Sequence, residues 1–249
     1  MTGSLVSVIL PAHNEEGLIA GALRSVAAQT LDPRLVEVVV VSNGSTDDTV
    51  PVAESEAARI AARGGPRPRV LADQPPGIAL AKNAGASAAD GQLLVFMDAD
   101  SRMSPGLLEA VRDRAAAGER AASIRIVADG RDPVDRAFFW ILENGKRLLR
   151  IRANMLWCEH RLFDELGGFD ESLRQAEDLD LLVRARRLGV PVGHIHGEWI
   201  ATSTRRLHRG RMRAGMFAMF GRWLLGHLGI GRRWPYQAGG PEAGADPEA

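Results

Sequence analysis

The sequence predicts an α/β fold, with a mostly parallel, doubly wound sheet flanked by helices. In the N-terminal part of the chain, short apolar runs alternate three times with stretches of helical period. Residues 36–41 read Val-Glu-Val-Val-Val-Val, and such a run is typical of a strand buried on both faces of a parallel sheet. Polar turn residues follow the apolar runs, so the loops lie at the carboxyl ends of strands, where sheets of this kind bind ligands.

The first half of the chain can be assigned in order from these patterns. Strands are expected at residues 5–10, 36–41, 69–72 and 93–97. Helical stretches follow the first three strands. One runs to about residue 29, one runs from the turn cluster 42–49 to about residue 62, and one covers residues 78–89.

The alternation is less regular in the second half. Ser104-Pro105 suits a helix start. Strands are expected at 121–128, 153–158 and 191–195, and a helical turn at 161–166. A helix over 177–188 ends at Gly189 and is expected to bury Leu181, Leu182, Ala185 and Leu188.

Residues 133–150 have a clear helical period. The expected inward stripe is Val134, Ala137, Phe138, Ile141, Leu142, Leu148 and Leu149. Phe139 and Trp140 lie off this stripe, and Trp140 stands among charged residues. An aromatic side chain in that position indicates either a ligand or partner surface or a second packing contact within the domain.

Composition sets the broad class of the protein. The chain has 249 residues, of which 45% are hydrophobic and 25% charged, as in an ordinary soluble globular protein. Lys and Arg number 31 and so do Asp and Glu, so no net field favours nucleic acid as a partner. Cys158 is the only cysteine, which excludes an intrachain disulfide and a cysteine-based zinc site. With no secretory signal pattern and no apolar run of about 18 residues, a cytoplasmic protein is expected.

Asp98 and Asp100 stand directly after the apolar run 93–97. Side chains alternate along a strand, so the two carboxylates are expected to point the same way from an extended backbone. They repel each other unless a cation lies between them, and Mg²⁺ is usually held by one or two carboxylates plus substrate phosphates. Asp-x-Asp alone is a weak motif with a solvated turn as its alternative, but the position after a buried strand favours a metal site.

Five segments in order resemble the family 2 glycosyltransferases of the GT-A fold. They are Val8-Ile9-Leu10-Pro11-Ala12-His13-Asn14-Glu15-Glu16, Asn43-Gly44-Ser45-Thr46-Asp47, Ala81-Lys82-Asn83-Ala84-Gly85, Met97-Asp98-Ala99-Asp100, and Gly167-Gly168-Phe169-Asp170-Glu171 with Glu177-Asp178-Leu179-Asp180-Leu181. The match runs from about residue 5 to residue 190. It implies a Rossmann-like GT-A sheet with residues 1–103 as the nucleotide-sugar-binding half and residues 104–203 as the acceptor-binding and catalytic half of the same domain.

The resemblance also implies a set of donor-binding residues. They are Pro11, Ala12, His13, Glu15, Asn43, Asp47, Lys82, Asp98, Ala99, Asp100, Glu177, Arg205 and Arg206. Glu15 and Asp47 have structural alternatives, as a first-turn acid and as a helix cap. Lys82 is expected to reach the diphosphate, with a solvated helix residue as its alternative. Ser42 and Asn43 replace positions that are often acidic in the family, which leaves the base of the donor open although a UDP-sugar is favoured.

Asp98 and Asp100 are expected to hold Mn²⁺ or Mg²⁺ on the diphosphate, and Asp178 is expected to be the catalytic base. Like charges beside Asp178 would raise its basicity, and the alternative is an ordinary acid at a helix N-terminus. The family sometimes adds a late histidine to the metal, for which His194, His196 and His208 are the candidates.

The C-terminal segment is basic. From residue 203 to residue 241 there are eight arginines and no acid. Residues 204–236 have three interpretations: a loop that closes over the donor through Arg205 and Arg206, a basic amphipathic helix on the inner membrane face, or a structural or homodimer helix with solvated arginines. Residues 237–249, rich in Gly, Pro and acids, are expected to be disordered.

The resulting hypothesis is an inverting, metal-dependent transfer of a sugar from a nucleoside-diphosphate sugar to an acceptor hydroxyl. One alternative is a nucleotidyltransferase, but residues 11–16 lack the glycine and the Arg or Lys that its first loop needs. A dinucleotide-dependent oxidoreductase is disfavoured because no G-x-G-x-x-G follows the first strand. The third alternative is a non-catalytic nucleotide-sugar-binding module.

Overall fold

The computed structural model describes residues 5–148, 155–173, 175–205, 207–208 and 221. Their strands form one mixed sheet of eight in the order β3-β2-β1-β4-β7-β6-β8-β5. The strands are β1 (Val6–Ala12), β2 (Val36–Asn43), β3 (Pro68–Gln74), β4 (Leu93–Phe96), β5 (Ser101–Met103), β6 (Ala121–Asp129), β7 (Leu156–Glu159) and β8 (Val192–Ser203). The helices are α1 (Ile19–Ala27), η1 (Pro33–Leu35), α2 (Thr49–Ala62), α3 (Ile78–Ala88), α4 (Leu107–Ala116), α5 (Pro133–Leu148), α6 (His160–Glu165) and α7 (Glu177–Arg187). The predicted α/β fold is confirmed.

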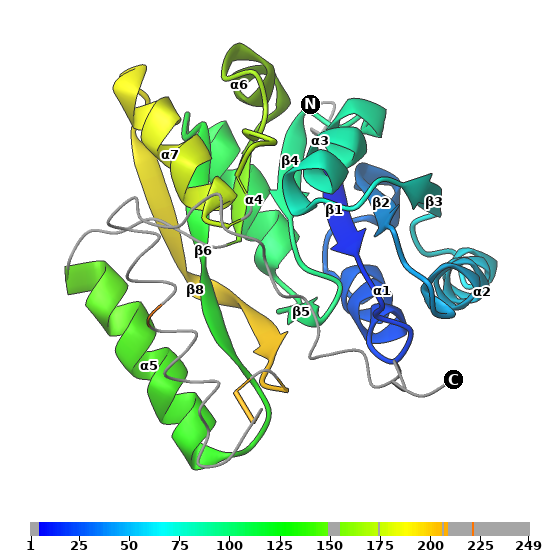
Figure 1. Ribbon diagram of the computed structural model, residues 1–249. Helices are drawn as coiled ribbons and strands as arrows, with labels where there is room; N and C mark the ends of the chain where they lie inside the picture. The colour runs from blue at the N-terminus through cyan, green and yellow to red at the C-terminus, as the bar shows by residue number, and fades with distance from the viewer. Residues whose placement is uncertain (1–4, 149–154, 174, 206, 209–220, 222–249) are drawn as a thin grey trace, which may run out of the picture.

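The parallel part of the sheet is buried on both faces. β1 pairs in parallel with β2 and β4, and β2 pairs in parallel with β3. Along β1, Val8 and Leu10 face a core formed with α1, α2 and α4, whereas Ile9 faces a second core formed with α3, α6 and α7. This alternation is the reason why the strands read as continuous apolar runs. The helices consequently cover both faces of the sheet (Figure 1).

The second half extends the same sheet. β7 pairs antiparallel with β4 and β6, and β8 pairs in parallel with β6 and antiparallel with β5. β8 is far longer than the predicted strand 191–195, because its polar second half gains hydrogen-bonding partners on both sides. The proposed division at residue 103 therefore runs through one sheet, and β5 from the first part lies at the far edge beside β8.

α5 packs on β6 along one side of the molecule (Figure 1), but with a different face inward from the one that the sequence predicts. Phe139 and Leu142 are buried against Ile126 and Leu207, whereas Val134 and Ile141 are exposed. The predicted inward stripe is therefore right for Leu142 and in part for Phe138, which packs on the same cluster, and wrong for Val134, Ala137 and Ile141. The helix turns instead to bury a charged stripe whose members find partners, as described below.

The buried face of α7 largely agrees with the prediction from the sequence. Leu181, Leu182 and Ala185 of α7 are buried as expected, but Leu188 is 60% exposed because the helix ends at Arg187. Arg206 and nearly all of the basic and acidic C-terminal segments lie outside the described residues. Among the residues that the structure describes, no helix is long and apolar enough to cross a membrane.

Candidate active site

Two loops at the carboxyl ends of β1 and β2 form one side of the site. Pro11 and Ala12 end β1 and are buried. The ring Nδ1 of His13 lies 2.8 Å from the carbonyl oxygen of Asn43. The backbone N–H of Glu15 donates to the Thr49 hydroxyl over 2.7 Å. These bonds fix the first loop against the second, so that the predicted nucleotide-contacting residues of both loops are brought together.

Asn43 and Asp47 each have a structural task. The side-chain oxygen of Asn43 accepts from the N–H of Gly77 over 2.6 Å, just ahead of α3. Asp47 accepts from the backbone N–H and the hydroxyl of Thr49 at the start of α2, and from the N–H of Glu16. Burial opposes ionisation of Asp47, but these hydrogen bonds outweigh it and lower the pKa of its carboxyl. Asp47 therefore holds the start of α2 through Thr49, although the N-cap residue itself is Asp48, and its donor contact stays a prediction.

The acidic pair lies in a turn. β4 ends at Phe96, and the N–H of Ser101 donates to the carbonyl of Asp98 over 3.0 Å. The prediction that the two side chains share one side of an extended strand is therefore wrong. Tertiary pairing holds the turn, because the N–H of Ser203, the last residue of β8, donates to the carbonyl of Asp100 over 3.1 Å. Asp100 is 7% exposed, and Asp98 is half-buried.

Arg205 brings its guanidinium to this turn. One of its nitrogens donates to Oε1 of the buried Glu15, and the same nitrogen lies 3.8 Å from Oδ2 of Asp100. Three predicted donor-site residues from distant parts of the sequence therefore meet at one place. The acids of the first loop and of the turn after β4 share a cation that the chain itself supplies.

A buried ion cluster joins α3 to the start of α7. The Nζ atom of Lys82 is 2.7 Å from Oε1 of Glu177 and 2.7 Å from Oδ1 of Asp178. Lys82 is 3% exposed and also lies over the ring of Phe169, at 5.2 Å from its centroid. The alternative of a solvated helix lysine is therefore wrong. Its periodicity with Ala79 and Ala86, which are both buried in α3, is the signal that could have placed Lys82 inward.

The three charges shift one another's ionisation. Burial raises the pKa of Asp178 to about 7; Lys82 opposes the rise and Glu177 adds to it. Burial likewise opposes ionisation of Glu177, but Lys82 outweighs it, and the pKa of Glu177 falls. For Lys82 burial disfavours the cation, yet the two carboxylates outweigh it and raise the pKa of the amine. The result is one carboxylate that stays ionised beside another that can exchange a proton near neutral pH.

Asn83, next to Lys82, anchors the segment before α7. Its amide donates to the carbonyl of Phe169 over 3.0 Å, and its oxygen accepts from the N–H of the same residue over 2.9 Å. Arg184 holds the neighbouring turn by donating to the carbonyls of Leu166 and Gly168. The tasks of Asn83 and Arg184 could not be predicted from the sequence, because the backbone carbonyls and the N–H that they bind are distant in the sequence.

Two of the candidate histidines lie far from the acidic turn. His194 Nδ1 is 2.7 Å from the hydroxyl of Ser123 on β6, and the His194 and His196 rings lie 4.3 Å apart. On β6, the partners of His194 and Ser203 are six residues apart (123 to 129), or roughly 20 Å at 3.3 Å per residue. His194 and His196 therefore do not complete a metal site at Asp98 and Asp100.

His208 has a different partner: its Nε2 lies 2.7 Å from Oδ2 of the buried Asp135 at the start of α5. Within the described ranges of the chain, no group of three or more His, Cys, Asp or Glu side chains is arranged to hold a metal ion. The protein part of a metal site at the turn consequently rests on Asp98 and Asp100.

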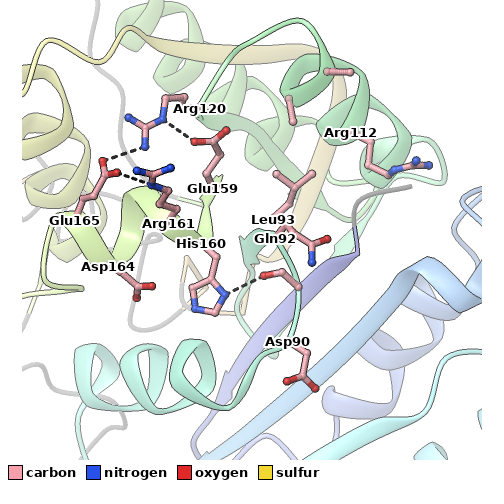
Figure 2. Close-up of a pocket in the computed structure, with 13 residues that line it drawn as sticks. Asp90, Gln92, Leu93, Arg112, Arg120, Glu159, His160, Arg161, Asp164 and Glu165 are labelled. Carbon is pink, nitrogen blue, oxygen red and sulfur yellow. Dashed lines mark hydrogen bonds and ion pairs between the residues drawn. The ribbon is translucent and has the colours of Figure 1, made fainter. Parts of the chain in front are cut away.

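A hollow of about 950 Å³ lies at the opposite end of β4 (Figure 2). Figure 2 shows Arg120 between Glu159 and Glu165, with which it makes hydrogen bonds of 2.6 and 3.0 Å, and His160 on the carbonyl of Gly91. The hollow borders the start of β4, whereas the acidic turn follows its end. Arg120 and Arg161 pair there with Glu159 and Glu165, and the hollow is separate from the site described above.

Comparison with known proteins agrees with this geometry. The family model described as "Glycosyl transferase family 2" matches residues 7–164. The uncharacterized glycosyltransferase Rv0539 of Mycobacterium tuberculosis is 31% identical over 194 residues, which are 77% of this chain and 78% of that protein. The uncharacterized glycosyltransferase EpsJ of Bacillus subtilis is 32% identical over 111 residues, 45% of this chain, and the match spans only 30% of EpsJ.

Solved structures share the fold. S. aureus TarS 1-349 superposes with a TM-score of 0.64 at 20% identity, covering 92% of this chain and 73% of that one. Mannosyltransferase PcManGT from Pyrobaculum calidifontis, solved with GDP-Man and Mn²⁺, superposes with a TM-score of 0.63 at 24% identity, covering 89% and 65%. TarS has also been solved in complex with UDP-GlcNAc. The family match, the relative of similar length and the shared fold together identify this chain as a glycosyltransferase of family 2.

Proposed function

We propose that this glycosyltransferase is an inverting enzyme that moves a sugar from a nucleoside-diphosphate sugar to an acceptor hydroxyl, with Asp178 as general base. The acceptor O–H gives its proton to the Asp178 carboxylate. The acceptor oxygen bonds to the anomeric carbon while the bond from that carbon to the diphosphate oxygen breaks. The configuration inverts, and the nucleoside diphosphate leaves with the bonding electrons.

The observation that carries the proposal is the setting of Asp178. A general base works best when its pKa lies near the working pH, and burial raises the pKa of Asp178 to about 7. Lys82 fixes the carboxylate from the donor side at 2.7 Å. Glu177, its pKa lowered, stays ionised beside it and balances the charge of Lys82. A merely structural helix-start acid does not need this arrangement.

The acidic turn suits a hard divalent cation. Its donor atoms are carboxylate oxygens, which Mg²⁺ and Mn²⁺ prefer, and the Arg205 guanidinium already lies 3.8 Å from Asp100 as a stand-in cation. Asp98 and Asp100 would hold the ion, and phosphate oxygens of the donor would fill the remaining positions. When bound, the ion neutralises charge on the departing diphosphate. Of the three candidate histidines, two are excluded by the sheet register, and the third, His208, pairs with Asp135.

The donor would lie over the first two loops. The first loop would contact the base and ribose through Pro11, Ala12, His13 and Glu15, and the second loop would do so through Asn43 and Asp47. The residues proposed for the diphosphate and sugar are Ala99, Lys82, Glu177, Arg205 and Arg206. TarS binds UDP-GlcNAc and PcManGT binds GDP-Man, so the fold accommodates either base. The side-chain amide of Asn43 both donates and accepts hydrogen bonds, so this residue leaves the identity of the base open. We favour a UDP-sugar as the donor.

The experiment has two parts. Thermal shift with UDP-, GDP- and dTDP-sugars, with Mn²⁺ or with EDTA, should identify a donor that stabilises the protein only with metal. Asp178→Asn should then retain donor affinity and lose turnover by about 10²- to 10⁴-fold. Turnover equal to that of the unmodified protein would exclude Asp178 as the base. Donor binding without any turnover in the unmodified protein would favour a non-catalytic binding module.

A further inference from the structure

α5 presents apolar side chains to solvent. Trp140 is 65% exposed, Ile141 60% and Val134 47%, and Ala137 beside them is exposed as well. These residues are spaced by three and four along the helix and therefore form one stripe. Arg136 and Arg147 are exposed as well and lie along its Trp140 edge. We call the stripe and these two arginines the α5 outer face.

The opposite face of the helix carries charged residues and is buried. Asp135 is 1% exposed and pairs with His208 at 2.7 Å. Lys146 is 3% exposed and donates to Glu143 over 2.5 Å, and Glu143 also lies 3.6 Å from His194. Turning the helix to bury the apolar stripe would separate Asp135 from His208 and Glu143 from His194, and it would expose Phe139 and Leu142. The outward position of Trp140 and Ile141 is therefore fixed by contacts on the other side.

The charges of α5 are sorted in the same way. Its acids point inward or are half-buried, and the half-buried Glu143 is paired with Lys146. Among the described residues of the helix, Arg136 and Arg147 are the exposed charged groups. The α5 outer face is consequently an aromatic and aliphatic stripe with a positive rim and no exposed acid.

We propose that the α5 outer face binds the surface of a bilayer that contains anionic lipid. Trp140 and Ile141 enter the boundary between headgroups and acyl chains, where the amphipathic indole is favoured. Arg136 and Arg147, which both lie along the Trp140 edge of the stripe, reach the lipid phosphates. The helix lies in the plane of the interface and does not cross it.

Two observations favour this partner over a second copy of the chain. A symmetric contact between two outer faces would bring arginine rims together with no exposed acid of the helix to neutralise them. In addition, the basic segment follows β8, and its residue Leu207 lies against α5. Leu207 packs on Phe139 and Leu142, and the sequence between residues 203 and 241 holds eight arginines and no acid.

The test is flotation of the full-length protein with vesicles of phosphatidylcholine, alone or mixed with phosphatidylglycerol. We expect binding to the mixed vesicles that falls as salt rises. Trp140→Ser with Ile141→Ser should weaken it by about tenfold, and Arg136→Gln by about fivefold. Leu188→Ser is the matched control, because Leu188 is also 60% exposed but lies at the end of α7. It should change nothing, and melting temperatures should show that every variant is folded.

Several results would overturn the proposal. They are equal binding to neutral and mixed vesicles, equal binding of the double variant and the unmodified protein, and equal weakening by Leu188→Ser. Absence of vesicle binding together with a dimer that the double variant dissociates, measured by analytical ultracentrifugation, would assign the face to a second copy instead. Because none of these measurements involves a sugar donor, failure here leaves the assignment of Asp178 untouched.

Discussion

Glu177→Gln tests the electrostatics of the proposed base. The substitution removes one negative charge from the buried cluster, while the amide keeps nearly the same shape and can still accept from Lys82. Since Glu177 raises the pKa of Asp178, its neutralisation should lower that pKa. Lys82, left with a single anionic partner, should act in the same direction.

The size of the shift follows from the geometry. Each of the two carboxylate oxygens lies 2.7 Å from the same Nζ atom, so they are at most about 5.4 Å apart (twice 2.7 Å). At an effective dielectric constant of about 20, two unit charges at that separation repel by roughly 3 kcal/mol, or about 2 pKa units. We expect the pKa of Asp178 to fall from about 7 by about 1 to 2 units.

The measurement is a titration of ¹³C-labelled aspartate carboxyl groups by NMR, which needs no substrate. Asp178→Asn assigns the resonance by removing it. Asp180→Asn is the matched control, because Asp180 lies in the same helical turn as Glu177 but pairs with Arg184. It should leave the titration of Asp178 near 7. A titration that is unmoved or higher in Glu177→Gln, or equally lowered in the control, would refute the reasoning.

The same group affects stability. In the unfolded chain Asp178 loses its proton near pH 4, whereas in the folded protein it keeps the proton to about pH 7. Between these values the folded state binds more protons, so the contribution of this group to stability falls as pH rises from about 4 to about 7. Glu177, with its lowered pKa, acts in the opposite sense at lower pH. Glu177→Gln should flatten the decline, as read from urea unfolding.

Three other substitutions give distinct expected results. Arg205→Ala removes a cation that competes for the acidic turn, so calorimetry should show an affinity for Mn²⁺ higher by about tenfold, or roughly 1.4 kcal/mol. Unchanged Mn²⁺ affinity with weaker donor binding would place Arg205 on the diphosphate instead. Ala176 has a left-handed φ of 61°, so Ala176→Gly should raise the free energy of unfolding, measured with urea, by about 1 kcal/mol. The control Ala137→Gly within α5 should lower it by about as much. A loss of stability in both variants would show that the backbone at Ala176 is not strained. Gly85→Ala would place a Cβ far too close to a methyl group of Ile9, and should lower the free energy of unfolding by about 1 to 3 kcal/mol. An unchanged midpoint of urea unfolding would show instead that α3 shifts freely.

The regular half of the fold could be predicted because local and tertiary signals agree there. β2 was expected at residues 36–41 and is Val36–Asn43, and α2 was expected to end near residue 62 and ends at Ala62. In these elements the hydrophobic period and the two-sided burial of a parallel sheet give the same answer.

The misjudged elements are those that tertiary partners define. β8 continues past residue 195 through a polar stretch, because β5 and β6 supply its hydrogen bonds. α5 turns its apolar stripe outward, because Asp135 is paired with His208 inside and Phe139 and Leu142 pack there on Leu207. No period in the sequence reveals such distant partners. The acidic residues of the site could be predicted from their residue types and their order in the sequence. The turn that contains Asp98 and Asp100 could not be predicted, because it depends on a hydrogen bond from Ser203, which is remote in the sequence.

The adjacency of Lys82 and Asn83 has a consequence for the tolerance of α3 to changes in length. Lys82 holds the start of α7, and the next residue holds Phe169. Inserting or deleting one residue between Gly77 and Lys82 would rotate both side chains by about 100° about the helix axis, and both links would be lost at once. We therefore expect homologues to vary in length in the loops on either side of α3, and to keep a fixed residue count from Gly77 to Asn83.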